Sequence, residues 1–274
     1  MTPKELFHEG KLTEAIATVS DGVKRRPADV SQRGLLCELL CFAGELERAD
    51  RQLDAIGQQE PEAMLGVAMF RHLIRAEQAR QQFYGEGRLP ELLGLPSPQL
   101  KLHLEASILL REGKTVEAAV LLEKAEAARP ALAGTCDGKP FDDLRDLDDL
   151  TSSFFEVLTS TGKYYWIPME QVERIEWHPP ERPRDLLWRR ASMTVSGGPD
   201  GEVFMPALYA GSHGHADDLI RLGRSTDWGD ERTAPMRGVG QRMFLFGDEA
   251  RAILELSEIT FNLPADADHG ETAS

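Results

Sequence analysis

Acidic residues gather near the middle of the chain, where residues Asp142–Asp146 read DDLRD. This is formally the D-D-x-x-D pattern whose carboxylates hold magnesium in isoprenoid synthases, since carboxylate oxygens suit Mg²⁺. Those enzymes need a large all-helical cavity and usually a second acidic motif, and neither fits this chain. Acidic residues also favour the first turn of a helix, where the helix dipole stabilises them. We therefore predict a structural or domain-interface role for this stretch.

A second candidate for metal chemistry is the run Ser212–His215, which reads SHGH and is followed by Asp217 and Asp218. Two imidazoles at positions i and i+2 supply only part of a zinc site, which needs three or four converging ligands. We interpret the run as a polar loop. We expect no metal and no cofactor.

The cysteines and the common catalytic motifs offer no stronger chemistry. Cys37 and Cys41 lie one helical turn apart in an apolar stretch, and Cys136 is isolated. They form no C-x-x-C pair, so we interpret two as core residues and one as a loop residue. The sequence contains no G-x-S-x-G, H-E-x-x-H or P-loop motif. We predict that the protein is not an enzyme.

All four tryptophans lie in the second half of the chain, and three of them adjoin charged residues. Tryptophan beside arginine is typical of binding surfaces. The alternative is that arginine stacks on tryptophan inside the core of that half. A rival function follows from the first interpretation, in which a small anionic ligand or substrate binds a pocket lined by Trp188, Arg189, Arg224, Asp227 and Trp228.

Composition limits the class of partner. The chain has 274 residues, a formal net charge of −15 and 41% hydrophobic residues, so about two domains are expected. Strong acidity disfavours nucleic acid and anionic membrane surfaces as partners. The first residues lack the apolar core of a signal peptide, and no apolar run approaches a membrane span. We expect a cytoplasmic protein.

The first half contains a sequence repeat, and the helices of that repeat would position any binding residues in this half. Three segments align without gaps, beginning at Gly10, Gly44 and Gly113. Each has an alanine five residues after its glycine and a proline seventeen residues after it. This pattern resembles the tetratricopeptide repeat, with glycine in the turn, alanine at the helix crossing and proline after the second helix.

We predict a tetratricopeptide-like helical domain over residues 1–133. Residues 64–84 should form one long helix, and a distortion should follow near residues 85–98. Stacked helical hairpins usually present a concave protein-binding surface. The tetratricopeptide resemblance places that groove on the first helix of each repeat, where the chain has Lys4, Phe7, His8, Glu38, Phe42, His103, Ser107 and Arg111. The alternative for each residue is ordinary core or ordinary surface.

The second half follows a different pattern. Apolar residues recur at steps of three and four over residues 142–158, which predicts an amphipathic helix. Short strand-like runs follow, and the SGGPDGE stretch at residues 196–202 predicts a hairpin turn. The fold class expected is therefore α+β, with an α-α superhelix, then a helix and a small, mostly antiparallel β-rich domain over residues 141–263. The tail over residues 264–274 is expected to be disordered.

Several uncommon strings occur in a fixed order through this half: DLRDLDDL, LTSTGKYYWIP, PPERPRDLLWRRA, GPDGEVFMPALY, RLGRSTDW and RGVGQR. Together they resemble the ImpE family, also called TagJ or SciE-type virulence proteins, which are accessory components of type VI secretion systems. The resemblance covers most of residues 141–263 and extends more loosely through the repeats.

The resemblance implies a non-enzymatic adaptor. Its expected partner is the N-terminal helix of the small contractile-sheath subunit (TssB, also called VipA), and its expected effect is on sheath assembly or on recycling by the AAA+ ATPase ClpV. Two surfaces stay open as the binding site, namely the groove of the repeats and the surface carrying Trp188, Arg189, Arg224 and Trp228. A further alternative makes the second half a dimerisation module.

Overall fold

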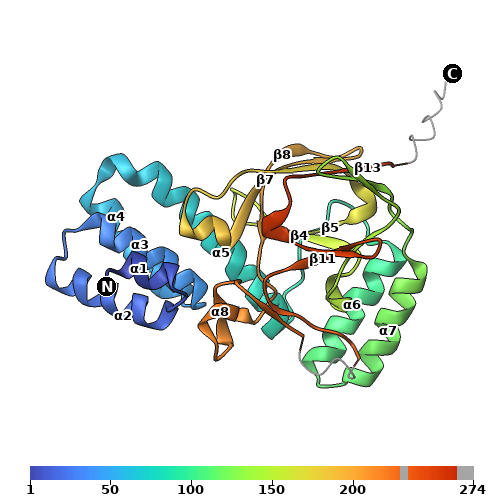
Figure 1. Ribbon diagram of the computed structural model, residues 1–274, viewed down its shortest axis with the longest axis horizontal. Helices are drawn as coiled ribbons and strands as arrows, with labels where there is room; N and C mark the ends of the chain where they lie inside the picture. The colour runs from blue at the N-terminus through green and yellow to red at the C-terminus, as the bar shows by residue number, and fades with distance from the viewer. Residues whose placement is uncertain (229–233, 264–274) are drawn as a thin grey trace.

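The computed structural model describes residues 1–228 and 234–263, so the predicted disordered tail lies outside the described residues. Seven helices fill the first half of the chain (Figure 1). They are α1 (Pro3–His8), α2 (Leu12–Arg25), α3 (Val30–Phe42), α4 (Leu46–Gln59), α5 (Met64–Glu86), α6 (Pro98–Arg111) and α7 (Thr115–Ala128). None of the described helices is both long enough and apolar enough to cross a membrane.

The repeat pattern explains where these helices turn. Gly10, Gly44 and Gly113 each stand between two helices with a φ of +72 to +81°, a backbone conformation that favours glycine. The three repeat alanines are fully buried where the paired helices cross, and the three repeat prolines lie just after the second helix of each pair. The helical hairpins predicted from the sequence are therefore confirmed.

The long helix is also confirmed, since α5 runs through the predicted range and ends at Gly87 in the left-handed conformation. The distortion after it is a loop over residues 87–97. Within this loop, Glu91 pairs with the outer strand of the sheet: its N–H donates to the Tyr164 carbonyl at 2.8 Å, and its carbonyl accepts from the Trp166 N–H at 3.1 Å.

The second half is built on an antiparallel sheet of eight strands, ordered β2-β1-β13-β6-β7-β8-β4-β5. Its strands are β1 (Gly134–Cys136), β2 (Lys139–Phe141), β4 (Phe154–Leu158), β5 (Tyr164–Pro168), β6 (Val172–Trp177), β7 (Trp188–Val195), β8 (Asp200–Pro206) and β13 (Glu258–Phe261). The predicted hairpin turn joins β7 to β8. A smaller sheet packs β12 (Glu249–Ala252), β11 (Met243–Phe246) and β3 (Leu144–Asp146).

The helix predicted over residues 142–158 is wrong. That stretch forms strand β3, a short 3-10 turn at Asp149–Thr151 and strand β4. All five residues of β4 are buried, because α5 covers one face of the strand and Phe244 of β11 packs on Phe155 from the other, so it shows no alternation of apolar and polar residues. The apolar residues of this stretch recur at steps of three and four because the chain passes from one strand through a turn into another, and not because it forms a helix.

Helix α5 is the element that joins the two halves. It lies against β4 and β5, and it stands between the hairpins of α1–α4 and the sheet (Figure 1). Near its end, Phe83 packs edge-on to Trp166 at 4.7 Å between ring centroids, and Trp166 stacks on Phe154 at 3.8 Å. One continuous hydrophobic core runs from α1 to β13. The division into domains at residues 133 and 141 stays a prediction.

Candidate partner-binding groove

A groove of about 580 Å³ opens between the first helices of two hairpins and a segment of the second half. Helices α1 and α3 form one wall, and residues 180–186 form the other. The lining residues are Lys4, Phe7, His8, Ser31, Gly34, Leu35, Glu38, Pro180, Glu181, Arg182, Pro183 and Leu186. Four residues predicted from the repeat pattern, namely Lys4, Phe7, His8 and Glu38, therefore line one groove.

Local sequence fixes the α1 wall. Thr2 caps the helix by accepting from the Glu5 N–H, and Glu5 accepts from the Thr2 N–H in return, which starts the helix just before Pro3. Phe7 is 5% exposed and packs on Phe42 of α3 with ring centroids 5.8 Å apart. Lys4 and His8, one turn apart, are both exposed at the groove edge.

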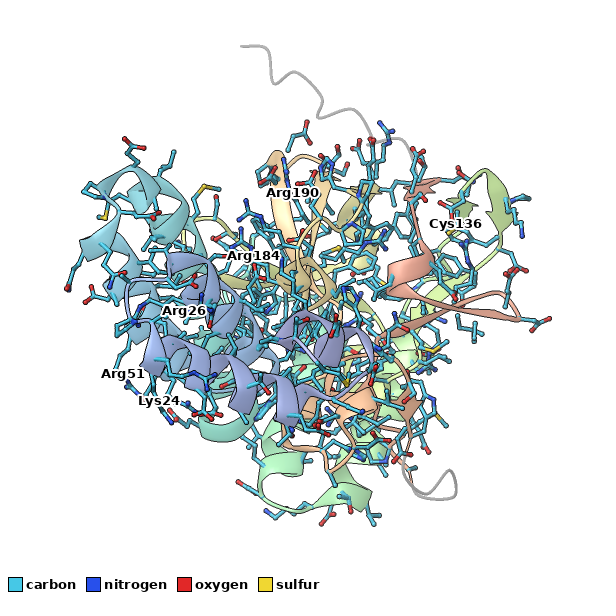
Figure 2. All side chains as sticks on the ribbon, turned by 60° about the vertical axis from the view of Figure 1, so that its left-hand side comes forward. Lys24, Arg26, Arg51, Cys136, Arg184 and Arg190 are labelled. Carbon is cyan, nitrogen blue, oxygen red and sulfur yellow. The ribbon has the colours of Figure 1, made fainter. Side chains whose placement is uncertain are left out.

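The opposite wall is a proline-rich turn. Asp185 accepts from the N–H groups of Glu181 and Arg182 at 2.9 Å each, and this holds the chain before the 3-10 helix η4 (Pro183–Leu186). The guanidinium of Arg184 lies over the Phe70 ring of α5 at 4.6 Å. Figure 2 shows Arg184 where the helical half meets the second half, whereas Lys24, Arg26 and Arg51 lie on the helical half. The wall is thus anchored to α5.

Glu38 is the charged residue at the base of the groove, with a side chain only 11% exposed. Burial raises the pKa of its carboxyl to about 6, although Arg184 and Arg182 oppose the rise. The closest cationic atom is Nη1 of Arg184, 3.9 Å away, which is too long for a hydrogen bond.

The other predicted groove residues lie elsewhere and are mostly buried. Phe42 is 1% exposed, His103 has no exposed surface and Ser107 is 3% exposed. His103 Nε2 lies 2.8 Å from the Ser153 hydroxyl, so this imidazole links α6 to the chain before β4. Arg111 donates to the Phe83 carbonyl and to the Ser107 hydroxyl. In this structure these four side chains hold elements together rather than face the groove.

The Trp and Arg residues of the second half are not brought into one pocket. Trp188 is 1% exposed and donates to Glu77 at 3.1 Å. Arg189 is buried, donates to the Ile253 carbonyl and lies over Trp177 at 5.6 Å. These two follow the alternative of arginine and tryptophan inside the core.

The remaining three candidates of that set contact different partners. Arg224 donates to the carbonyls of Phe7 and His8, at 2.5 and 2.6 Å, and Trp228 packs on Tyr209 with centroids 5.5 Å apart. Asp227 faces His215 at 3.8 Å. The set proposed for an anionic ligand is thus scattered over the described part of the molecule.

The loop that begins with SHGH packs against the helical hairpins. Asp218 accepts from the N–H and the hydroxyl of Thr13 at 2.8 and 3.1 Å. A methyl group added at Gly44 would lie 2.5 Å from the His213 ring, and one added at Gly10 would lie 2.5 Å from Leu219. The loop over residues 211–224 therefore covers two of the three repeat turns. Among the described residues, no cluster of histidine, cysteine and carboxylate side chains could hold a metal ion.

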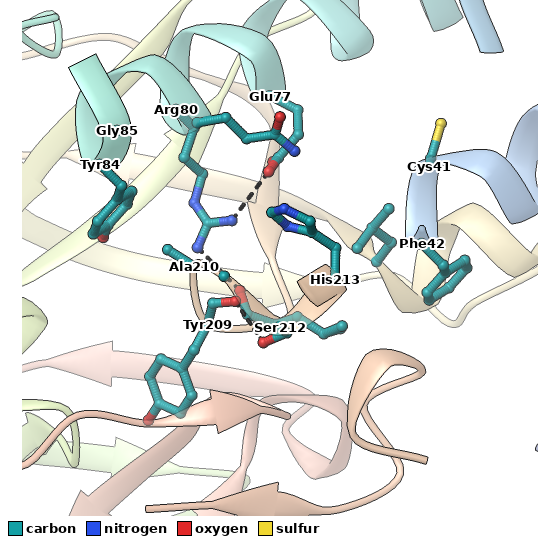
Figure 3. A pocket seen from close by; sticks show the side chains of 14 residues that line it. Cys41, Phe42, Glu77, Arg80, Tyr84, Gly85, Tyr209, Ala210, Ser212 and His213 are labelled. Atoms are coloured by element: carbon teal, nitrogen blue, oxygen red, sulfur yellow. Dashed lines mark hydrogen bonds and ion pairs between the residues drawn. The ribbon is translucent and has the colours of Figure 1, made fainter. Parts of the chain in front are cut away.

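A second cavity, of about 360 Å³, lies beneath this loop (Figure 3). His213 lies there between Arg80 and the side chains of Cys41 and Phe42 (Figure 3). Arg80 donates to Glu77, to both oxygens of Glu156 and to the Leu208 carbonyl, so its nitrogens are all engaged within the protein. We interpret this cavity as part of the junction between the two halves.

Comparison with known proteins decides the family. Residues 138–260 match the family described as ImpE protein. The type VI secretion system accessory component TagJ of Pseudomonas aeruginosa is 32% identical over 97% of this chain and 93% of its own length. The chain belongs to the ImpE family. A crystal structure of protein VPA1032 from Vibrio parahaemolyticus superposes with a TM-score of 0.88 at 28% identity, covering 94% of this chain and 97% of that one. The family resemblance is confirmed, and so is the fold class of a helical first half followed by a mostly antiparallel β-rich half.

The part that matches the ImpE family also contains a buried ionic network that sequence reasoning missed. Glu156 of β4 accepts from Arg80 of α5, at 2.9 Å for each oxygen, and from Arg242. Arg242 also donates to Asp146 at 2.7 Å, and the Tyr209 hydroxyl donates to the same carboxylate at 2.7 Å. Burial by itself raises the pKa of Glu156, but the two arginines outweigh it and lower the value to about 2.

The DDLRD stretch has its role in this network. Asp146 and Asp148 are almost fully buried, and Asp148 accepts from Arg237 at 2.9 Å and from the Gly238 N–H at 3.0 Å. Arg145 forms an ion pair with Asp149 at 2.7 Å, across the turn between β3 and β4. Both carboxylates are turned inward, since Asp146 ends the strand β3 and Asp148 caps the 3-10 turn that follows it.

Proposed function

We propose that this protein is a non-catalytic accessory protein of a type VI secretion system that acts in the cytoplasm and binds an amphipathic helix in the groove between α1, α3 and residues 180–186. The helix proposed is the N-terminal helix of the small sheath subunit, TssB or VipA. By holding that helix, the protein would influence sheath assembly or the recycling that depends on ClpV.

The observation that carries the proposal is the groove itself. Its α1 and α3 wall is the surface that helical repeats use for protein partners, and four residues predicted for that surface line it. Leu35 and Leu186 are partly buried there beside Phe7, which offers an apolar base, while Lys4, Glu181 and Arg182 supply charge at the edges. An apolar base with a polar rim is the arrangement that accepts one face of an amphipathic helix.

Membership in the ImpE family supports the biological setting, because the Pseudomonas relative is a type VI secretion accessory component. The scattered positions of Trp188, Arg189, Arg224 and Trp228 weigh against the anionic-ligand alternative and favour the repeat groove over that second surface.

The test fills the groove without removing a core side chain. Gly34 lies in α3 and lines the groove, and nothing lies within 4 Å of a Cβ added to it. We therefore expect Gly34→Leu to fold as the wild type does and to gain helix propensity of about 1 kcal/mol. Binding of a fluorescein-labelled peptide, the N-terminal helix of the cognate small sheath subunit, is measured by anisotropy for full-length protein.

We expect Gly34→Leu to weaken peptide binding by about 10-fold or more, since the leucine occupies space that the helix needs. The matched control is Gly66→Leu, which also adds a side chain at an open helical glycine but lies outside the groove, on α5. Equal binding by wild type and Gly34→Leu would place the partner elsewhere, and no binding by the wild-type protein would reject this partner.

A further inference from the structure

Five carboxylates are buried in the part of the chain that the structure describes, and one differs from the rest. The five are Glu38, Glu77, Asp146, Asp148 and Glu156. Glu77 accepts from Trp188 at 3.1 Å and from Arg80 at 3.2 Å, and the three in the ionic network accept from arginine, tyrosine or backbone groups. Across residues 1–228 and 234–263, no protein group donates a hydrogen bond to Glu38.

Buried polar groups in folded proteins are almost always hydrogen-bonded, so an exception needs a physical reason. Three basic residues lie near Glu38, but none reaches it. Arg184 is held 3.9 Å away with its guanidinium over Phe70, while Lys4 and Arg182 stand at the rim. Solvent in the open groove hydrates the carboxylate in the free protein, and the side chain keeps 11% of its surface exposed for it.

A helix that occupies the groove removes this hydration. If it covered Glu38 with apolar side chains alone, it would leave a carboxylate without a donor, which is strongly unfavourable. The groove therefore selects against a uniformly apolar face. A cationic side chain satisfies both the charge and the acceptors of a carboxylate, and such charge-assisted hydrogen bonds are the strong ones.

We infer that the helix bound in this groove presents one lysine or arginine to Glu38, set among apolar residues that contact Phe7, Leu35 and Leu186. This inference rests on the proposed function and makes Glu38 its specificity-determining residue. Charge at the rim is mixed, since Glu181 lines the groove beside Lys4 and Arg182. Rim charges are screened by solvent, so the partly buried carboxylate dominates selection.

The experiment is a double-mutant cycle on full-length protein with the sheath-subunit helix peptide as the probe. Glu38→Gln keeps the shape of the side chain and removes its charge. We expect it to weaken binding by about 10- to 100-fold, as loss of a charge-assisted hydrogen bond does. Replacing each lysine or arginine of the peptide by glutamine in turn should find one position with a similar loss. The double variant should bind no more weakly than either single variant.

Two controls separate a specific pair from general charge. Glu181→Gln changes the net charge of the same groove at its rim and should alter affinity by about twofold or less. The thermal transition of Glu38→Gln is recorded to show that the variant is folded. Affinity is also compared between pH 7.5 and 5.5 in two variants, namely His8→Gln, which leaves no imidazole among the described residues that line the groove, and Glu38→Gln. Binding should weaken at the lower pH in His8→Gln and not in Glu38→Gln.

The outcomes separate this inference from the proposed function. If Gly34→Leu weakens binding but Glu38→Gln does not, the groove binds the helix and the inference about Glu38 is overturned. The inference is also overturned if Glu38→Gln weakens binding while no peptide cation matters, because Arg184 would then supply the donor. If Gly34→Leu binds as the wild type does, the groove assignment itself fails.

Discussion

The buried network around Glu156 and the groove around Glu38 place a carboxylate beside arginine in opposite ways. Glu156 accepts from two arginines and two tyrosines, which hold its pKa at about 2. Burial raises the pKa of Glu38 to about 6, since its closest arginine is turned toward Phe70. The first carboxylate is satisfied within the chain and joins its two halves. The second is left for a group from outside.

The largest effect on stability should come from breaking the buried network around Glu156. Glu156→Gln leaves Arg80 and Arg242 buried without their shared carboxylate, and loss of one member of a buried ionic network costs about 3–5 kcal/mol. The free energy of unfolding from urea titration should fall by that amount. The control is Glu202→Gln, which removes an exposed pair with Arg190 and should cost about 0.5 kcal/mol. Equal losses in the two variants would contradict the distinction.

Among the described residues, His103 is buried without an ion pair, so it tests the effect of burial alone on a pKa. Burial lowers the pKa of His103 to about 4, against 6.5 in the unfolded chain. Between these values the unfolded state binds the extra proton, so stability falls as pH drops from about 6.5 to 4, by about 3 kcal/mol in all. Urea unfolding of wild type and His103→Gln at pH 7 and pH 4.5 should show a smaller loss in the variant. The same loss in both would assign the pH dependence to other groups.

The groove exists only while the first hairpins stay packed on the second half of the chain. Substitutions at two repeat glycines test that packing. Gly44→Ala adds a methyl 2.5 Å from His213 at φ +72°, whereas Gly113→Ala adds one in open space at φ +75°. The shared left-handed strain costs about 1 kcal/mol, and displacement of the loop should add about 1 kcal/mol for Gly44→Ala alone. Thermal unfolding of both variants gives the difference. Equal losses would mean that His213 moves aside at no cost.

The smallest effect should have the opposite sign. The folded-state pKa of Glu38 is raised, so its ionisation destabilises the free protein progressively as pH rises from about 4.5 through 6. Glu38→Gln should therefore increase the free energy of unfolding by about 1 kcal/mol at pH 7.5, the value being reduced by solvent in the groove, and leave it unchanged at pH 4. A loss of stability at pH 7.5 would show that Glu38 already has a donor in the free protein.

Sequence reasoning succeeded where structure depends on neighbours along the chain. Gly10, Gly44 and Gly113, in phase with their alanines and prolines, predicted the hairpins because turn, crossing and helix end are local requirements. It failed at residues 142–158, where burial on both faces removed the alternation that marks a strand.

The candidate site divides in the same way. The groove positions on α1 and α3 were predictable from helix order within the repeat. The wall over residues 180–186 was not, because it comes from a distant part of the chain and packs through Arg184 on Phe70. The network was equally hidden, since nothing in sequence pairs Arg80 with Glu156. The buried candidates His103 and Ser107 show the limit of a repeat pattern, which gives the face of a helix but not what covers it.

The position of Arg80 on α5 has a consequence for turnover of the protein. A cut in the loop after α5 would leave Arg80 with Glu77 as its acceptor, because its other acceptors, Glu156 and the Leu208 carbonyl, belong to the other piece. Neither fragment would then retain a satisfied interior. We expect proteases to meet the chain either whole or fully unfolded, so that a cell controls the amount of this protein without accumulating half-molecules.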